Sequence, residues 1–207
     1  MQFRPNPRTA MRDFQLKRFV LALIAALSCG RAAMTDAESL RLPEPHLQDK
    51  LAQTMQQRRS LREFAPKSLS LETAARLLWA AQGISSPDGL RTAPSGGALY
   101  PLELHLVAGE VAGLPAGSYR YDPAEHGLTR IVRGDLRPAL ARAALNQSWI
   151  AEAPAAVVIA AVPRRSTRKY GERGIRYVHI EVGHAGQNLL LQATAVGLGG
   201  TVVGAFD

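Results

Sequence analysis

Cysteine is almost absent from this sequence of 207 residues. The single Cys29 excludes an internal disulfide and a cysteine-based metal site. His179 and His184 are five residues apart, which separates them by about 140° around a helix, whereas the zinc-protease motif needs a spacing of four. A phosphate-binding Gly-Lys-Ser/Thr loop and a Gly-x-Ser-x-Gly nucleophile elbow are also missing. The sequence therefore predicts no metal site and offers no motif for nucleophilic catalysis.

Lysine is scarce as well. The formal net charge is +8, and the basic residues are nearly all arginine, with lysine only at positions 17, 50, 67 and 169. No run of five basic residues occurs, and aromatic residues make up only 6% of the chain. The sequence therefore does not indicate nucleic-acid binding. Arginine forks suit phosphate and carboxylate groups, although a solvated, arginine-rich surface explains the same composition.

Long hydrophobic runs are missing too, and the uncharged apolar run at residues 19–28 is too short to span a bilayer comfortably. It follows a basic start and precedes Gly30, Ala32 and Ala33, a pattern typical of an export signal. We expect residues 1–33 to be a signal or N-terminal extension, and a cleaved signal would make the protein periplasmic. The alternatives are an N-terminal helix of the mature fold or an over-long gene start, in a cytoplasmic protein. Residues 34–46, with Pro43 and Pro45, are expected to form a linker.

From residue 47 onward, helical and strand patterns are mixed. Helices are expected over 47–57, over 71–82 after a Ser70 cap, and over 136–145. Strands are expected over 102–107, 118–122, 127–131 and 155–162, the last with the apolar composition of a buried strand. Residues 164–174 are expected to be a charged connection. This order predicts an α+β domain with a mainly antiparallel central sheet flanked by helices.

The stretch 176–207 is the longest segment with one clear pattern. Small and apolar residues recur at steps of three and four from Val182 to Gly197, which predicts a long helix. Polar residues are mixed into this pattern, so we expect a helix that is buried nearly all round, against protein or a ligand. Gly197, Gly199 and Gly200 should end the helix, and a short strand should follow over 201–206. Such an arrangement needs a partner to complete it.

Two shorter segments have side chains or backbone suited to ligand binding. The first is Arg-Arg-Ser-Leu-Arg-Glu-Phe at 58–64, where Arg58, Ser60 and Arg62 can converge on one phosphate or one polar ring edge. A charged helix end is the simpler explanation of that segment taken alone. The second is Ala-Pro-Ser-Gly-Gly-Ala-Leu-Tyr-Pro at 93–101, whose glycines let backbone approach a flat ligand closely.

These two segments, followed by residues 169–207, resemble the nitroreductase superfamily, and within it most closely the SagB-type, or thiazole/oxazole-forming, dehydrogenase branch. The resemblance covers roughly residues 50–207. It implies a nitroreductase-like α+β domain over 47–207 that binds FMN at a homodimer interface containing the long helix. It also implies that NADH or NADPH supplies electrons, which pass through flavin N5 to a small-molecule or peptide substrate.

The resemblance further implies roles for individual residues. The residues that match the family's FMN-binding positions are Arg58, Arg59, Ser60, Arg62, Ser95, Gly96, Gly97, Gly204 and Ala205. Lys169 and Tyr170 match a pair to which base chemistry is assigned in azoline oxidation, and an exposed turn pair is the alternative. The superfamily normally continues beyond the position of Asp207 with a segment that carries a basic residue for the FMN phosphate.

Three functions remain open from the sequence. The first is an FMN-dependent oxidoreductase of nitroreductase type, which moves electrons between a reduced nicotinamide and an organic acceptor. The second is a SagB-type peptide azoline dehydrogenase. The third is a catalytically degenerate flavin-fold protein that only dimerises or binds a ligand.

Overall fold

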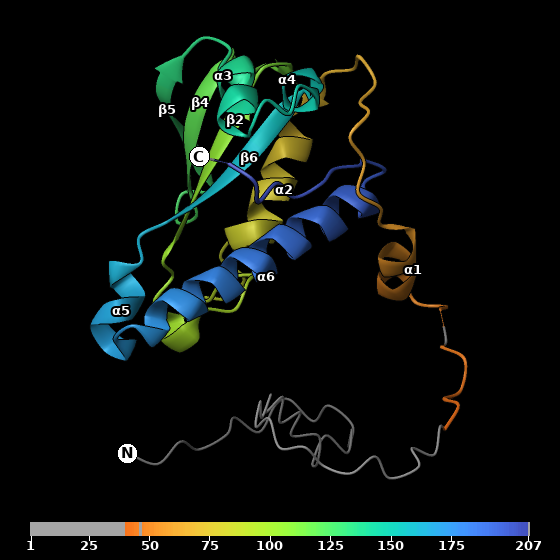
Figure 1. Ribbon diagram of the computed structural model, residues 1–207, viewed down its shortest axis with the longest axis vertical. Coiled ribbons are helices and arrows are strands. Elements are labelled where there is room, and N and C mark those ends of the chain that lie inside the picture. The colour runs from red at the N-terminus through yellow and green to blue at the C-terminus, as the bar shows by residue number, and fades with distance from the viewer. Residues whose placement is uncertain (1–39, 46, 207) are drawn as a thin grey trace. The chain divides into compact units, whose positions relative to one another are not determined.

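The computed structural model describes residues 40–45 and 47–206 (Figure 1). The chain divides into two compact units, residues 1–44 and residues 45–207. Residues 40–44 are exposed and form no helix or strand. The predicted export signal at 1–33 and Cys29 lie outside the described residues, as does most of the predicted linker. Cell fractionation tests the export prediction, which an uncleaved, cytosolic full-length protein would contradict.

A four-stranded antiparallel sheet forms the centre of the second unit (Figure 1). Its strand order is β5 (Gly127–Arg133), β4 (Gly117–Asp122), β2 (Leu102–Ala108) and β6 (Ala155–Ala161). In β4 the buried residues alternate with more exposed ones, as expected for a strand with one covered face. Two short strands, β1 (Leu69–Ser70) and β3 (Val111–Ala112), pair in parallel beside it. The predicted α+β class and antiparallel sheet are confirmed.

Two helices, α2 (Leu71–Gln82) and α6 (Arg173–Ala195), pack on each other and against this sheet. The Ser70 hydroxyl accepts a hydrogen bond from the Thr73 N–H and so caps α2, as predicted. The shorter helices are α1 (Lys50–Gln57), α3 (Arg137–Ala143), α4 (Trp149–Glu152) and α5 (Arg164–Tyr170), and a 3-10 turn spans Gly96–Ala98. Leu78 of α2 meets Leu104 and Leu106 of β2 in the main core, and a smaller cluster forms around Ile150.

Three predictions about individual segments are wrong. Residues 164–174 are not a connection, because α5 occupies most of them and α6 already begins at Arg173. Residues 201–206 form no strand, since they find no neighbouring strand in the described part of the chain beyond an isolated bridge at Gly200. Strand β6 lies at the edge of the sheet and is half-buried along its whole length, although its apolar composition predicted a buried strand.

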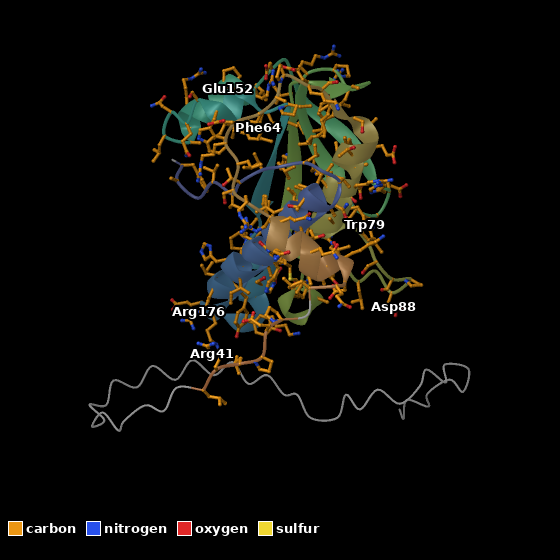
Figure 2. The ribbon with its side chains drawn as sticks, turned by 90° about the vertical axis from the view of Figure 1, so that its right-hand side faces the viewer. Arg41, Phe64, Trp79, Asp88, Glu152 and Arg176 are labelled. Carbon is orange, nitrogen blue, oxygen red and sulfur yellow. The ribbon has the colours of Figure 1, made fainter. Side chains whose placement is uncertain are left out.

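A single chain does not bury α6 all round, so the predicted burial against protein or a ligand stays a prediction that needs a partner. One stripe of the helix is exposed, and it consists of Ile175, Arg176, His179, Ile180, Gly183, His184 and Gln187. The sheet and α2 cover only the opposite side, while Arg176 projects outward from the helix (Figure 2). Ile175 is 42% exposed and Ile180 48% exposed, so the stripe is partly apolar. No helix among residues 40–45 and 47–206 is long and apolar enough to cross a membrane.

The first turn of α6 packs closely on α5. A Cβ atom on Gly174 would lie 2.8 Å from the Ser166 carbonyl carbon and 2.8 Å from the Thr167 nitrogen, both backbone atoms. We expect Gly174→Ala to destabilise the protein by about 1–3 kcal/mol, because the two helices must separate. Gly186→Ala is the matched control in the same helix, since its Cβ would make ordinary contacts at 3.8 Å or more. Denaturant unfolding measures both, and equal stabilities of the two variants would contradict the packing argument.

Arg137 ties α3 to neighbouring segments through a network of ion pairs. It is nearly buried, donates to Asp135, Glu110 and the Ala153 carbonyl oxygen, and holds the pKa of Asp135 below its ordinary value of 3.8. A depressed pKa in the folded state stabilises the fold above the unfolded-state pKa and loses this effect as pH falls through the folded-state value. We therefore expect Asp135→Asn to lower the thermal midpoint at neutral pH, and the difference from the unmodified protein to shrink well below pH 3.8. A difference in thermal midpoint that stays constant from neutral pH to well below pH 3.8 would contradict the lowered pKa of Asp135.

Candidate functional site

The loop at 95–97 is held by a carboxylate from α6. Glu181 is only 3% exposed, and its Oε1 accepts hydrogen bonds from the Ser95 hydroxyl at 3.0 Å and from the Gly96 N–H at 2.9 Å. The Ser95 hydroxyl oxygen in turn accepts from the Tyr100 N–H at 2.9 Å. Gly97 has a φ of +69°, which glycine adopts without strain. These contacts fix the backbone of the 95–97 loop at the N-terminal half of α6.

Lys169 and Tyr170, at the end of α5, lie directly against Gly97. A Cβ atom on Gly97 would be 2.5 Å from the Tyr170 Oη and 2.9 Å from the Lys169 Nζ. The Tyr170 ring packs edge-on against the Tyr177 ring of α6, with centroids 5.1 Å apart. The structure thus brings together the predicted Lys-Tyr pair and the predicted 95–97 loop, which are more than seventy positions apart in the sequence.

The 58–62 segment follows α1 and runs beside the glycine turn after α6. The Leu61 N–H donates to the Gly200 carbonyl oxygen at 3.1 Å, and Ser60 forms an isolated parallel bridge with Gly200. The approach at Gly199 is close, because a Cβ there would be 2.3 Å from Leu61 Cδ1. The glycine turn predicted from the sequence therefore positions the backbone of the 58–62 segment.

The guanidinium groups of the 58–62 segment have no carboxylate partner among the described residues. Arg59 donates to the carbonyl oxygens of Gln56 and Arg58, and Arg62 lies over the Trp149 ring, 5.8 Å from its centroid. Trp149 also packs near Phe64, which Figure 2 shows beside α4 and Glu152. Three arginines without acidic partners suit a dianion such as a phosphate monoester, so this donor set fits the FMN phosphate.

Gly204 and Ala205 lie in the irregular segment after the glycine turn. Both are exposed, and a Cβ on Gly204 would meet no atom within 4 Å. The Ala205 carbonyl oxygen accepts a bond from Gln147 Nε2 at 3.4 Å, while Val203 packs against the cluster around Ile150. The segment is therefore held at the α3–α4 side, and the backbone of Gly204 is open to a ligand.

The predicted cofactor-binding residues form two groups beside α6. The 95–97 loop contacts α6 at Glu181. Helix α5 lies next to the N-terminal end of α6 (Figure 1). The 58–62 segment meets the turn at Gly200, beyond the helix end at Ala195. The chain after the helix turns back along it, because a Cβ atom on Gly200 would lie 3.5 Å from Leu190 Cδ2. Glu181 and Leu190 are nine residues apart, which corresponds to about 13.5 Å along a helix. The two groups therefore contact α6 at separate places.

Three residues of this region escaped the sequence reasoning: Glu181, Tyr177 and Trp149. Glu181 had a detectable signal, because it lies three positions after Val178 and four before Ala185 on the buried side of α6. A carboxylate on an apolar stripe needs hydrogen-bond donors, and it finds them in the 95–97 loop. Tyr177 and Trp149 had no local signal, since their partners come from other elements.

The exposed side of α6 contains an open hollow of about 640 Å³. Its lining residues are Glu172, Arg173, Ile175, Arg176, His179 and Ile180. The last four of them belong to the exposed stripe, where a partner would cover apolar and basic side chains together. Within the part of the chain that the structure describes, no three His, Cys, Asp or Glu side chains gather as a metal site.

Comparison with known proteins gives a consistent result. A model of the Nitroreductase family matches residues 55–207. A protein of Methanocaldococcus jannaschii, named provisionally as a nitroreductase, is 44% identical over 173 residues, which are 84% of this chain and 87% of the relative. The match therefore extends over nearly all of both chains.

Two solved structures show the same fold. A structure from Anabaena variabilis, also described provisionally as a nitroreductase, is 31% identical with a TM-score of 0.66; the match covers 75% of this chain but only 32% of that one. This chain thus spans about a third of that protein. A structure from the E. coli microcin synthetase McbBCD complex, with truncated pro-MccB17 bound, is 26% identical with a TM-score of 0.59 and covers 89% of this chain and 72% of that one.

Proposed function

The chain belongs to the nitroreductase family, and we propose that it is an FMN-dependent oxidoreductase that moves electrons between NADH or NADPH and an organic acceptor. The family match supports an oxidoreductase. The observation that carries the cofactor assignment is the 58–62 segment, where three arginines without acidic partners flank Ser60 on a backbone fixed by Gly200. When bound, FMN accepts and donates an electron pair at its N5 atom, so the protein's task is to hold and tune the cofactor.

Different residues of this chain are assigned to different parts of FMN. We assign phosphate and ribityl binding to Arg58, Arg59 and Ser60, and a ring-edge contact to Arg62, which leaves Trp149 when the site is occupied. Ser95, Gly96 and Gly97 present backbone along the flavin plane, with Glu181 fixing their conformation. Gly204 and Ala205 supply exposed backbone at the reactive edge, where an N–H donor stabilises the reduced form.

A homodimer completes this site. In one chain the 95–97 loop contacts Glu181 of α6, whereas the 58–62 segment contacts the turn at Gly200. In a twofold dimer with the α6 helices antiparallel, the 95–97 loop of one protomer approaches the 58–62 segment of its partner. The exposed stripe with Ile175 and Ile180 supports α6 as the contact surface. Each dimer then contains two equivalent sites, and each site draws residues from both protomers.

Steady-state kinetics tests the proposal. We expect FMN-reconstituted protein to oxidise NADH or NADPH with a quinone or nitroaromatic dye as acceptor, and to give parallel double-reciprocal lines because the cofactor alternates between two substrates. The same protein stripped of FMN is the control. Saturable FMN binding without any electron transfer from either nicotinamide would favour the degenerate flavin-fold alternative. Absence of both would contradict the proposal.

A second candidate is peptide azoline dehydrogenation. The contact of Lys169 and Tyr170 with Gly97 favours it, because a base at this place can remove one ring proton of an azoline. FMN, when bound, would accept the second hydrogen with its electron pair as a hydride. The E. coli structure with truncated pro-MccB17 bound supports a peptide substrate for this fold. Lys169→Ala with Tyr170→Phe should then abolish azoline oxidation and leave FMN bound. If the double variant still oxidises a synthetic azoline peptide, this candidate fails.

A further inference from the structure

A second, smaller cavity lies away from the 58–62 segment, between the end of α2 and the sheet. Its volume is about 280 Å³, which is small for an organic ligand site. The lining residues are Gln82, Arg91, Leu102, Glu103, Leu104, Arg120, Tyr121, Asp122, Pro123 and Arg165. Three arginines from three different segments thus meet at one small cavity, together with two acidic residues.

The two acidic residues of the cavity are already engaged. Glu103 forms an ion pair with Arg165, whose guanidinium also donates to the Tyr100 carbonyl oxygen at 3.2 Å. The Asp122 Oδ1 accepts from the Ala124 N–H at 2.8 Å and so closes the turn between β4 and β5. Neither carboxylate pairs with Arg91 or Arg120, and among the described residues these two arginines form no ion pair.

Arg91 is the least exposed of the three arginines of the cavity, and it forms no ion pair with a described carboxylate. Its Nη1 donates to Gln82 Oε1 at 2.7 Å, and its guanidinium lies over the Tyr100 ring, 4.5 Å from the centroid. Burial is the main cause that lowers the pKa of Arg91, and the positive charge of Arg165 acts in the same direction, while Tyr100, Tyr121 and Asp122 raise it. Arg91 and Arg165 line the same cavity, and of the two only Arg165 forms an ion pair among the described residues, so the cavity has room and positive charge for an anion.

We propose that this cavity binds a small oxyanion, a carboxylate or phosphate group, between Arg91, Arg120 and Arg165. The planar guanidinium groups supply paired N–H donors for two oxygens, and the exposed Arg120 closes the rim. The volume suits a phosphate ion or a dicarboxylate and not a nucleotide.

Tyr100 connects this cavity to the 95–97 loop. The Tyr100 N–H donates to the Ser95 hydroxyl oxygen, its carbonyl oxygen accepts from Arg165, and its ring lies under Arg91. An oxyanion that fixes Arg91 and Arg165 therefore also restrains the residue that follows the loop. This consequence adds to the proposed flavin chemistry, but the binding itself does not depend on it.

Calorimetric titration with inorganic phosphate and with malonate, at constant ionic strength set by chloride, tests the site. We expect the unmodified chain to bind one or both probes, and Arg91→Gln to weaken binding about tenfold or more, because a charge-assisted contact is lost. Arg120→Gln should weaken binding less, while Arg91→Lys should retain part of it. Arg142→Gln, an exposed arginine on α3 outside the cavity, is the matched control and should bind as the unmodified chain does.

The affinities of the two probes for the unmodified chain and the variants support or overturn the proposed site. Binding of phosphate alone or malonate alone identifies which oxyanion the cavity takes. No binding of either probe overturns the proposal, and so does binding that Arg91→Gln and Arg120→Gln leave unchanged, since the anion then lies elsewhere, for example at the 58–62 segment. If Arg91→Gln does not fold, the anion affinities of Arg120→Gln and Arg91→Lys test the proposal instead. Affinities equal to that of the unmodified chain in both variants would overturn it. FMN is not needed in any titration, so failure here is distinguishable from failure of the proposed function.

Discussion

Replacement of Glu181 by alanine is expected to weaken FMN binding about a hundredfold, because two hydrogen bonds to a carboxylate, worth about 1.5–3 kcal/mol each, disappear. These bonds come from the Ser95 hydroxyl and the Gly96 N–H, so the 95–97 loop loses the contact that fixes its backbone. The variant should also have a lower thermal midpoint, since two partly buried donors are left unpaired. Quenching of FMN fluorescence and thermal unfolding measure the two effects.

Two variants serve as controls for this result. Glu181→Gln keeps a carbonyl oxygen for the same donors, so its loss of affinity should be clearly smaller. Glu172→Ala removes an exposed carboxylate just before α6 and should leave FMN affinity close to that of the unmodified protein. If Glu181→Ala binds FMN as tightly as the unmodified protein, the 95–97 loop is not part of the cofactor site.

A mixture of two inactive variants is expected to recover activity. The segment variant is Arg58→Ala with Arg59→Ala, and the loop variant is Glu181→Ala. In a dimer whose sites combine the segment of one protomer with the loop of its partner, a mixed dimer contains one intact site and one doubly damaged site. Equal co-expression should therefore give about a quarter of the unmodified activity, because half of the dimers are mixed and half of their sites are intact.

The matched control for this experiment pairs the segment variant with itself, carried on two plasmids, and should remain inactive. Differently tagged chains allow the mixed dimers to be isolated, and their activity per dimer should be about half that of the unmodified dimer. Inactive mixed dimers would show that one chain supplies both groups of residues. A chain that stays monomeric at all concentrations would contradict the shared site more directly.

Much of the fold could be predicted because its signals are local. Ser70 caps α2 as its position before Leu71 and Glu72 predicts, and the alternating residues of β2 and β4 give the strands of the sheet. The glycine turn after α6 could also be predicted, since Gly197 has a φ of +76°. These features depend on residues close in the sequence, which is where composition and periodicity are informative.

The remaining features depend on contacts between distant residues. Nothing around Arg164 to Tyr170 distinguishes a charged loop from the helix α5, because that helix is stabilised by packing on Gly174 of α6. An apolar strand such as β6 looks the same at the edge of a sheet as at its centre. The approach of Tyr170 to Gly97 and the pairing of Ser60 with Gly200 follow from the topology of the chain. The separation of the two groups of predicted site residues along α6 needed the structure as well.

The central claim is that this chain binds FMN and uses it for electron transfer. The most direct test is the visible absorption spectrum of the purified, FMN-reconstituted protein after gel filtration, with mass analysis of the cofactor released on denaturation. We predict flavin bands that persist through the column, one FMN released per chain, and bleaching of the bands when NADH or NADPH is added without air. A colourless protein that releases no flavin after reconstitution would contradict the account.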